Sequence, residues 1–184
     1  MDATGGSRGG AAGEAALVAR ARAGDEAAFA ALVRPHLRLL HTVCRRITGD
    51  EHTAEDATQA ALLAAWRHLD RFEGRARIST WLYQIAHNAA LAELRRRTPE
   101  PAGAGAELPG QGSARGPEDQ VLARMSVQQA LALLPPDFRA ALVLREYAGL
   151  SYAEIAEAEG IRVETVKTRI LRARRAVAKE LGMG

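Results

Sequence analysis

The chain has 184 residues, enough for one mid-sized domain or two small ones. Hydrophobic residues make up 47% and aromatic residues only 4%, a composition that disfavours a large β-sandwich core. The single cysteine, Cys44, excludes an internal disulfide and any multi-cysteine metal site. A net charge of +3 favours an anionic partner only weakly, so the placement of the charges is more informative.

No apolar run approaches the ~18–20 residues that span a bilayer, and the N-terminus has no apolar signal-peptide core. We therefore expect a cytoplasmic protein without membrane insertion. Residues 1–13 predict a disordered leader and residues 98–117 a flexible Pro/Gly/Ala-rich linker, because neither can bury enough surface to offset its backbone entropy. Residues 14–97 and 118–184 lack period-two alternation, which predicts an all-α protein of two small helical modules.

In the first module, Asp25 can cap a helix that Pro35 is expected to kink or split. A further helix is predicted from about Thr53 to Asp70, followed by a short loop and a helix over 78–97. That last helix ends in three arginines. Basic residues are generally favourable at a helix C-terminus, so this run alone indicates nothing about nucleic acid.

In the second module, a helix is expected over 118–134, and another runs from the two prolines that follow to a C-cap at Gly149. Ser151 begins a capping box for a short helix, which ends at a turn containing Gly160. A final helix starts near Val163. Two helices joined by a tight glycine turn are typical of a helix-turn-helix.

Charge divides sharply at this turn. Residues 118–159 carry seven acidic and three basic side chains, net −4, whereas residues 160–184 carry seven basic and two acidic ones, net +5. On a helical wheel, the final helix has an apolar stripe of Val163, Val166, Ile170, Ala173, Val177 and Leu181. The opposite face shows Glu164, Thr168, Leu171, Arg172, Arg175 and Lys179, and Leu171, its one apolar member, suits a thymine methyl in a major groove. A solvated basic face that binds nothing is the alternative, but the preceding turn favours DNA binding.

The chain contains AEDATQAALLAAWRHLDRF and STWLYQIAHNAALAELRRR, then LPPDFRAALVLREYAGLSYAEIA and VETVKTRILRARRAV. In this order the segments resemble the extracytoplasmic-function (ECF) group of the sigma-70 family, from about Gly24 to Leu181 except for the linker. The resemblance implies a transcription initiation factor without a cofactor or catalytic activity, with residues 14–97 like sigma region 2 and 118–184 like region 4. It implies as partners core RNA polymerase, through the β′ clamp and β flap, promoter DNA and an anti-sigma factor.

By that resemblance, the helix from Thr53 would dock on the β′ clamp through Asp56, Gln59, Leu63 and Arg67. Ala60 stands where the family usually has an acidic residue. The next helix and the loop before it would open and bind the minus-ten element through Arg75, Arg77, Trp81, Gln84, Asn88 and Arg95. An aromatic ring can stack on an unpaired base, an amide can contact a base edge and arginine can bind phosphate. The loop departs from the common family pattern, which predicts a non-standard minus-ten preference.

The same resemblance assigns the minus-thirty-five element to the final helix. Lys167, Thr168, Leu171 and Arg172 would contact bases, with Thr165 beside them, and Arg145, Arg169 and Arg175 would contact phosphate. Promoter elements about a turn and a half of DNA apart are roughly 50–55 Å distant. The linker spans ~25 Å relaxed and ~66–72 Å fully extended, so we expect polymerase to hold the modules apart.

Three other classes of protein fit the sequence less well. A stand-alone regulator would need a ligand pocket or dimerisation helix, and neither has a signature here; operator binding without polymerase would favour it. An enzyme or metal protein is suggested only by His36, His41, Cys44 and His52, but His36 and His41 diverge by about 140° on a helix, and no nucleophile–base pattern appears. The third class is a protein that only sequesters a partner. Loss of transcription when both Arg172 and Asn88 are substituted would contradict this hypothesis.

Overall fold

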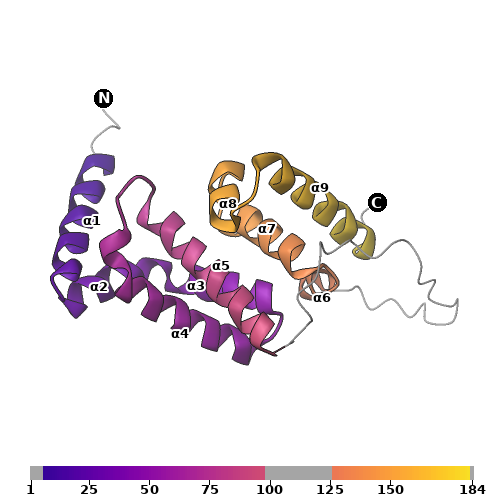
Figure 1. Ribbon diagram of the computed structural model, residues 1–184, viewed down its shortest axis with the longest axis horizontal. Coiled ribbons are helices and arrows are strands. Elements are labelled where there is room, and N and C mark those ends of the chain that lie inside the picture. The colour runs from indigo at the N-terminus through magenta and orange to yellow at the C-terminus, as the bar shows by residue number, and fades with distance from the viewer. Residues whose placement is uncertain (1–5, 98–125, 183–184) are drawn as a thin grey trace, which may run out of the picture.

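The computed structural model describes residues 6–97 and 126–182, with side chains from residue 13 onward, and these ranges contain helices and no strand (Figure 1). The predicted linker, residues 98–117, and residues 118–125 lie outside the described ranges. The helices of the first module are α1 (Gly6–Arg22), α2 (Glu26–Val33), η1 (Arg34–His36), α3 (Leu37–Thr48), α4 (Glu51–Arg67), η2 (Leu69–Arg71) and α5 (Ile78–Arg97). Those of the second are α6 (Val127–Ala132), α7 (Pro136–Glu146), α8 (Tyr152–Glu159) and α9 (Val163–Glu180).

Several boundaries in the structure differ from the sequence predictions. Helix α4 ends at Arg67 and not at Asp70, and α7 ends at Glu146 with Tyr147 as its C-cap, so Gly149 follows the cap. Helix α1 begins at Gly6, inside the segment expected to be disordered, because this alanine-rich stretch continues into a helix that buries Val18. Helix α4 begins at Glu51, since the Asp50 side chain accepts hydrogen bonds from two backbone N–H groups and caps it. In the second module, Ser126 caps α6 in a capping box, so the helix expected over 118–134 is broken there.

The core of the first module lies between α3, α4 and α5. Helix α4 turns a row of small side chains inward, which lets the two neighbouring helices approach closely, and the larger side chains come from α3 and α5. The buried residues are Leu40, Val43 and Ile47 of α3, Ala54, Ala57, Ala61 and Ala65 of α4, and Ile78, Leu82, Ala86 and Ala90 of α5. Helix α4 therefore keeps its opposite side at the surface.

Helix α7 is the centre of the second module. Its five consecutive residues from Ala140 to Leu144 are all buried, and such a run covers the whole circumference of a helix. Helix α9 packs on one side of it through Val166, Ile170 and Ala173, as the apolar stripe predicts. The glycine turn is present as well, with Gly160 at φ +65°, and the helix-turn-helix prediction is confirmed.

The two modules pack against each other. Figure 1 shows α7 and α8 lying along α3 and α5, with α9 on the outer side. The guanidinium of Arg139 in α7 donates a hydrogen bond to the carbonyl oxygen of Ile47 in α3, 2.9 Å away. The described ranges thus form one packed body, in contrast to the separated modules expected on promoter DNA.

Candidate polymerase and nucleic-acid interfaces

The outer side of α4 carries the predicted polymerase-binding residues. Gln59, Leu63 and Arg67 are exposed along it, and the Leu63 side chain, with the residue 49% exposed, is the apolar member. Asp56 differs from them, because its carboxylate lies 3.3 Å from Arg97 of α5 in an ion pair. The structure therefore brings three of the four residues onto one open face and holds the fourth against α5.

The predicted minus-ten residues of α5 follow one side of the helix but differ in exposure. Trp81 is half-buried, with its ring centroid 5.4 Å from that of Phe72, whereas Asn88 and Arg95 are exposed. The Gln84 side chain donates to the backbone oxygen of Glu154 in α8, 3.3 Å away. An aromatic ring and two exposed polar side chains thus share this side of the helix.

The loop before α5 adds a cleft of 270 Å³ beside Trp81. It is lined by Arg71, Phe72, Glu73, Gly74, Arg75, Ala76, Trp81 and Gln84, together with Glu157 of α8. Arg75 is exposed and pairs with Glu73 at 2.6 Å, and Arg77 is exposed on the same loop. The lining therefore combines two aromatic rings with two arginines and two glutamates.

One residue that supports this loop was not predicted from the sequence. Arg22 of α1 donates hydrogen bonds to the backbone oxygens of Leu69 and Phe72, where the chain leaves α4 for the loop. Its partners lie 47 and 50 residues away, so no local pattern could have indicated this role.

The outward side of α9 presents most of the predicted minus-thirty-five residues. Thr165, Lys167, Thr168, Leu171, Arg172 and Arg175 are all exposed. Leu171 is 49% exposed between polar neighbours, as expected for a residue that meets an apolar group on a partner. This row is polar and mainly basic, with Leu171 as its one apolar member, and Lys167 pairs with the exposed Glu164, 3.6 Å away.

Two arginines predicted to contact phosphate make side-chain contacts within the second module. Arg169 is half-buried and pairs with Glu159 at 2.8 Å and with Asp137 at 3.2 Å. Arg145 donates to the Leu150 oxygen, 2.8 Å away, and covers the ring of Tyr152. On a wheel, Arg169 lies only about 40° from Ala173 of the apolar stripe, a signal that could have placed it there.

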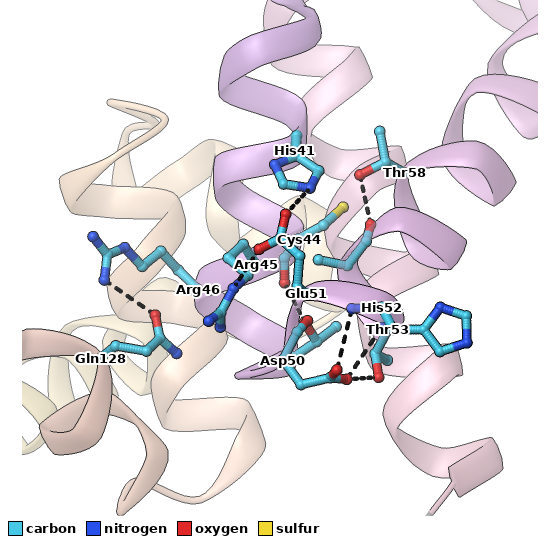
Figure 2. A network of polar contacts seen from close by, with 12 residues as sticks. His41, Cys44, Arg45, Arg46, Asp50, Glu51, His52, Thr53, Thr58 and Gln128 are labelled. Carbon is cyan, nitrogen blue, oxygen red and sulfur yellow. Dashed lines mark hydrogen bonds and ion pairs between the residues drawn. The ribbon is translucent and has the colours of Figure 1, made fainter.

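His41, Cys44 and His52 are shown in Figure 2, and the ring of His36 lies 6.2 Å from that of Tyr83, measured between centroids. His41 lies 3.2 Å from a carboxylate oxygen of Glu51, and His52 is exposed. Cys44 is fully buried, and this burial raises the pKa of its thiol to about 11. Among the residues with described positions, no three His, Cys, Asp or Glu side chains are grouped closely enough to bind a metal ion. No helix in the described ranges is long and apolar enough to span a membrane.

Comparison with known families matches both modules. Residues 32–100 match sigma-70 region 2, and residues 124–177 match sigma-70 region 4. The chain is 36% identical over 176 residues to the ECF RNA polymerase sigma factor SigW of Bacillus subtilis, covering 89% of this chain and 94% of that protein. It is 38% identical over 169 residues to the ECF RNA polymerase sigma factor SigM of Mycobacterium tuberculosis H37Rv, covering 92% of this chain and 85% of that protein.

Solved structures show the same arrangement of helices. The sigma factor RpoE in complex with the anti-sigma factor NepR from Bartonella quintana matches with a TM-score of 0.64 and 25% identity, over 82% of this chain and 94% of that one. CnrH in complex with the cytosolic domain of CnrY matches with a TM-score of 0.66 and 28% identity, over 92% of this chain and 97% of that one.

These matches define a transcription initiation factor of the sigma-70 family, which binds RNA polymerase and directs it to promoter DNA. Proteins of this family are initiation factors rather than enzymes. Within the family, the chain belongs to the ECF group of sigma factors.

Proposed function

We propose that the chain divides promoter recognition among three helices: α4 binds the β′ clamp, α5 and its loop open the minus-ten element, and α9 enters the major groove of the minus-thirty-five element. The exposed row on α9 is the observation that carries this proposal. Its apolar stripe fixes one side against α7, so Leu171 and Arg172 point outward at the middle of an eighteen-residue helix that follows a glycine turn.

Charge and shape support a base-reading role for this row. Arginine can bind a guanine edge through two hydrogen bonds, and leucine can contact the thymine methyl. Arg175, one turn further along, is placed to neutralise phosphate, which adds affinity without sequence preference. Arg145 and Arg169 support the same surface indirectly. Arg169 joins α9 to Glu159 of α8, and Arg145 of α7 holds the start of α8 through Leu150 and Tyr152.

The first module supplies the remaining two functions. Leu63 would be buried against the β′ clamp, and the second module would contact the β flap. The side of α5 with Trp81, Gln84 and Asn88 would hold unpaired bases of the minus-ten element, with Arg75, Arg77 and Arg95 on the phosphates. Trp81 supports this role because it is only partly buried and lines the cleft.

The test is reconstitution of the chain with core polymerase, followed by genome-wide mapping of transcript starts. We expect starts that share a minus-ten and a minus-thirty-five element and that depend on the chain. A matched reaction with the double variant Arg172→Ala/Asn88→Ala should lose these starts while retaining core binding. Transcript starts that depend on the chain but share no upstream sequence would contradict the proposed roles of α5 and α9.

We also propose that an anti-sigma factor restrains the chain. The similar RpoE structure contains the anti-sigma factor NepR, and the similar CnrH structure contains the cytosolic domain of CnrY. A partner of this kind must displace the chain from core polymerase in an equilibrium competition. Core affinity that is unchanged by every purified protein that binds the chain contradicts this proposal.

A further inference from the structure

The outward side of α9 carries one acidic side chain in its first turn, among basic and polar neighbours. Glu164 is the second residue of this helix, and its side chain is 78% exposed. The row to which it belongs continues through Thr168, Leu171 and Arg175, all of them exposed. Glu164 has no part in the roles proposed above for α9, so its place in this row needs an explanation of its own.

The rotation of α9 about its axis is fixed by the residues that the helix buries, Val166, Ile170 and Ala173. At 100° per residue, Glu164 lies about 150° from the middle of this buried stripe and about 20° from Leu171. The Thr168 hydroxyl donates to the backbone oxygen of Glu164, 2.9 Å away, which joins the two residues on the outward side. A DNA duplex that meets Leu171 therefore also meets Glu164.

The first turn of α9 is the part of the helix that the proposed complex brings nearest to the bases. In a helix-turn-helix, the N-terminal residues of the second helix contact base edges. The turn at Gly160 and the N-cap residue Arg162 directly precede Glu164. Glu164 and Lys167, one turn further along, are therefore among the first side chains to enter the groove.

Contacts within the chain do not explain why this carboxylate faces outward. It pairs with Nζ of Lys167 at 3.6 Å, and both side chains are more than half exposed. Exposed pairs of this kind contribute little to stability. A carboxylate in the first turn also interacts favourably with the helix dipole, but it can do so from any side of the helix. Stability alone thus does not require the groove-facing position.

A carboxylate can distinguish bases because it only accepts hydrogen bonds. In the major groove, cytosine offers its N4 amino group and adenine its N6 amino group, whereas guanine and thymine offer acceptors. A carboxylate placed against guanine or thymine would lose water without gaining a donor, which is unfavourable. The contact that a glutamate typically makes in this groove is with cytosine N4.

The negative charge strengthens this discrimination. DNA phosphates repel Glu164 on every sequence, while Lys167 and Arg175 attract the same phosphates regardless of sequence. A base that donates to the carboxylate offsets the repulsion, and a base that does not leaves it in place. The effect of Glu164 on affinity should therefore depend on the base that it faces.

We propose that Glu164 determines specificity at one position of the minus-thirty-five element, where its carboxylate accepts a hydrogen bond from cytosine N4 and excludes guanine and thymine. The inference rests on the proposed entry of α9 into the major groove. On binding, the ion pair with Lys167 opens, and Lys167 donates to a different base. The pair then presents one acceptor and one donor, three residues apart on the helix.

The test uses holoenzyme reconstituted with the full-length chain, on a base-substitution series of the minus-thirty-five element found by transcript-start mapping. The unmodified chain should prefer cytosine over guanine and thymine by about tenfold at one position. Glu164→Ala should remove this preference and keep those at other positions. Glu164→Gln should favour adenine there, because an amide can bond N6 and N7 of adenine together.

Two further variants separate a base contact from other effects. Glu180→Gln, at the exposed last residue of α9, changes the net charge as Glu164→Gln does and should leave every base preference unchanged. Lys167→Ala should keep the cytosine preference, because Glu164 makes that contact itself. The helical circular-dichroism signal of the Glu164 variants should match that of the unmodified chain, since the side chain is exposed.

Uniformly tighter binding by Glu164→Ala, with the base preferences intact, would overturn the proposal, because Glu164 would then only repel phosphate. Loss of the cytosine preference in Lys167→Ala would overturn it as well, since Glu164 would then act only by orienting Lys167. A holoenzyme indifferent to every base of the element would refute the proposed function of α9 and this inference with it. Preferences that depend on Arg172 but not on Glu164 would leave that function standing and contradict this inference alone.

Discussion

Arg22 of α1 donates a hydrogen bond from Nε to the backbone oxygen of Leu69, 3.1 Å away, and a second bond to the oxygen of Phe72. Since Phe72 packs on Trp81, this arginine fixes the start of the loop and one wall of the cleft. Hydrogen bonds from charged donors are stronger than those between neutral groups.

Arg22→Ala should slow opening of the minus-ten element by about tenfold, or ~1.4 kcal/mol, the scale of one hydrogen bond from a charged donor. Core affinity and minus-thirty-five preference should not change. Arg22→Lys should restore part of the rate, because an ammonium can reach one carbonyl but lacks the planar fork. Arg20→Ala is the control, since Arg20 pairs at the surface with Asp25. Equal slowing by both alanine variants, measured by fluorescence of a 2-aminopurine base, would contradict a positioning role for Arg22.

Leu63 provides a test of the polymerase surface. Replacing it with aspartate should weaken core binding by about 1–3 kcal/mol, since a buried apolar contact becomes an unpaired charge. The helical circular-dichroism signal should be nearly unchanged because Leu63 is exposed in the chain. Leu37→Asp, at another exposed leucine, should bind core normally in the same titration. Normal core affinity of Leu63→Asp would refute the assignment of this face of α4.

The buried thiol of Cys44 should report unfolding of the first module. Burial raises its pKa to about 11, so at pH 8 much less of it is thiolate than of an unperturbed cysteine. The native chain should therefore react very slowly with 5,5′-dithiobis(2-nitrobenzoate). The rate should rise with urea in parallel with the unfolded fraction. Fast reaction without urea would show that the α3–α5 core opens locally.

Glu154 should make the free energy of unfolding depend on pH. The Ser151 backbone N–H that bonds its carboxylate, helped by the Ser151 and Thr80 hydroxyls, lowers the pKa of Glu154. A lowered pKa in the folded chain means that this stabilisation is present above the ordinary pKa and is lost as the pH falls through the lowered one. Glu154→Gln keeps the capping geometry but loses the charge. The difference in free energy of unfolding between the two chains should therefore shrink from pH 6 to pH 3, and a difference that stays constant would contradict this.

Features that depend on neighbouring residues were predictable from the sequence. The capping box at Ser151, the turn at Gly160 and the break at Pro35 follow from local backbone chemistry, and the structure has all three. The N-terminus of α4 was misplaced because Thr53 and Asp50 are both good caps, and only the structure shows which one accepts the backbone N–H groups.

Contacts between distant segments were not predictable in this way. The hydrogen bond from Thr80 to Glu154 joins residues 74 positions apart, and nothing in the period of either helix specifies the partner. Arg169 shows a related difficulty. Its charge favours a phosphate contact, but its place beside the apolar stripe brings it to Glu159 and Asp137 inside the module.

The most direct test of base reading by α9 compares Arg172→Ala with Arg175→Ala in the holoenzyme, on a base-substitution series of the minus-thirty-five element at two salt concentrations. Arg172→Ala should flatten the preference at one or two positions, worth roughly 1–3 kcal/mol each. Arg175→Ala should weaken binding to all sequences alike and lower the salt dependence by about one counterion. If Arg172→Ala instead weakens binding uniformly and leaves the preference intact, α9 is an electrostatic anchor and does not read the element.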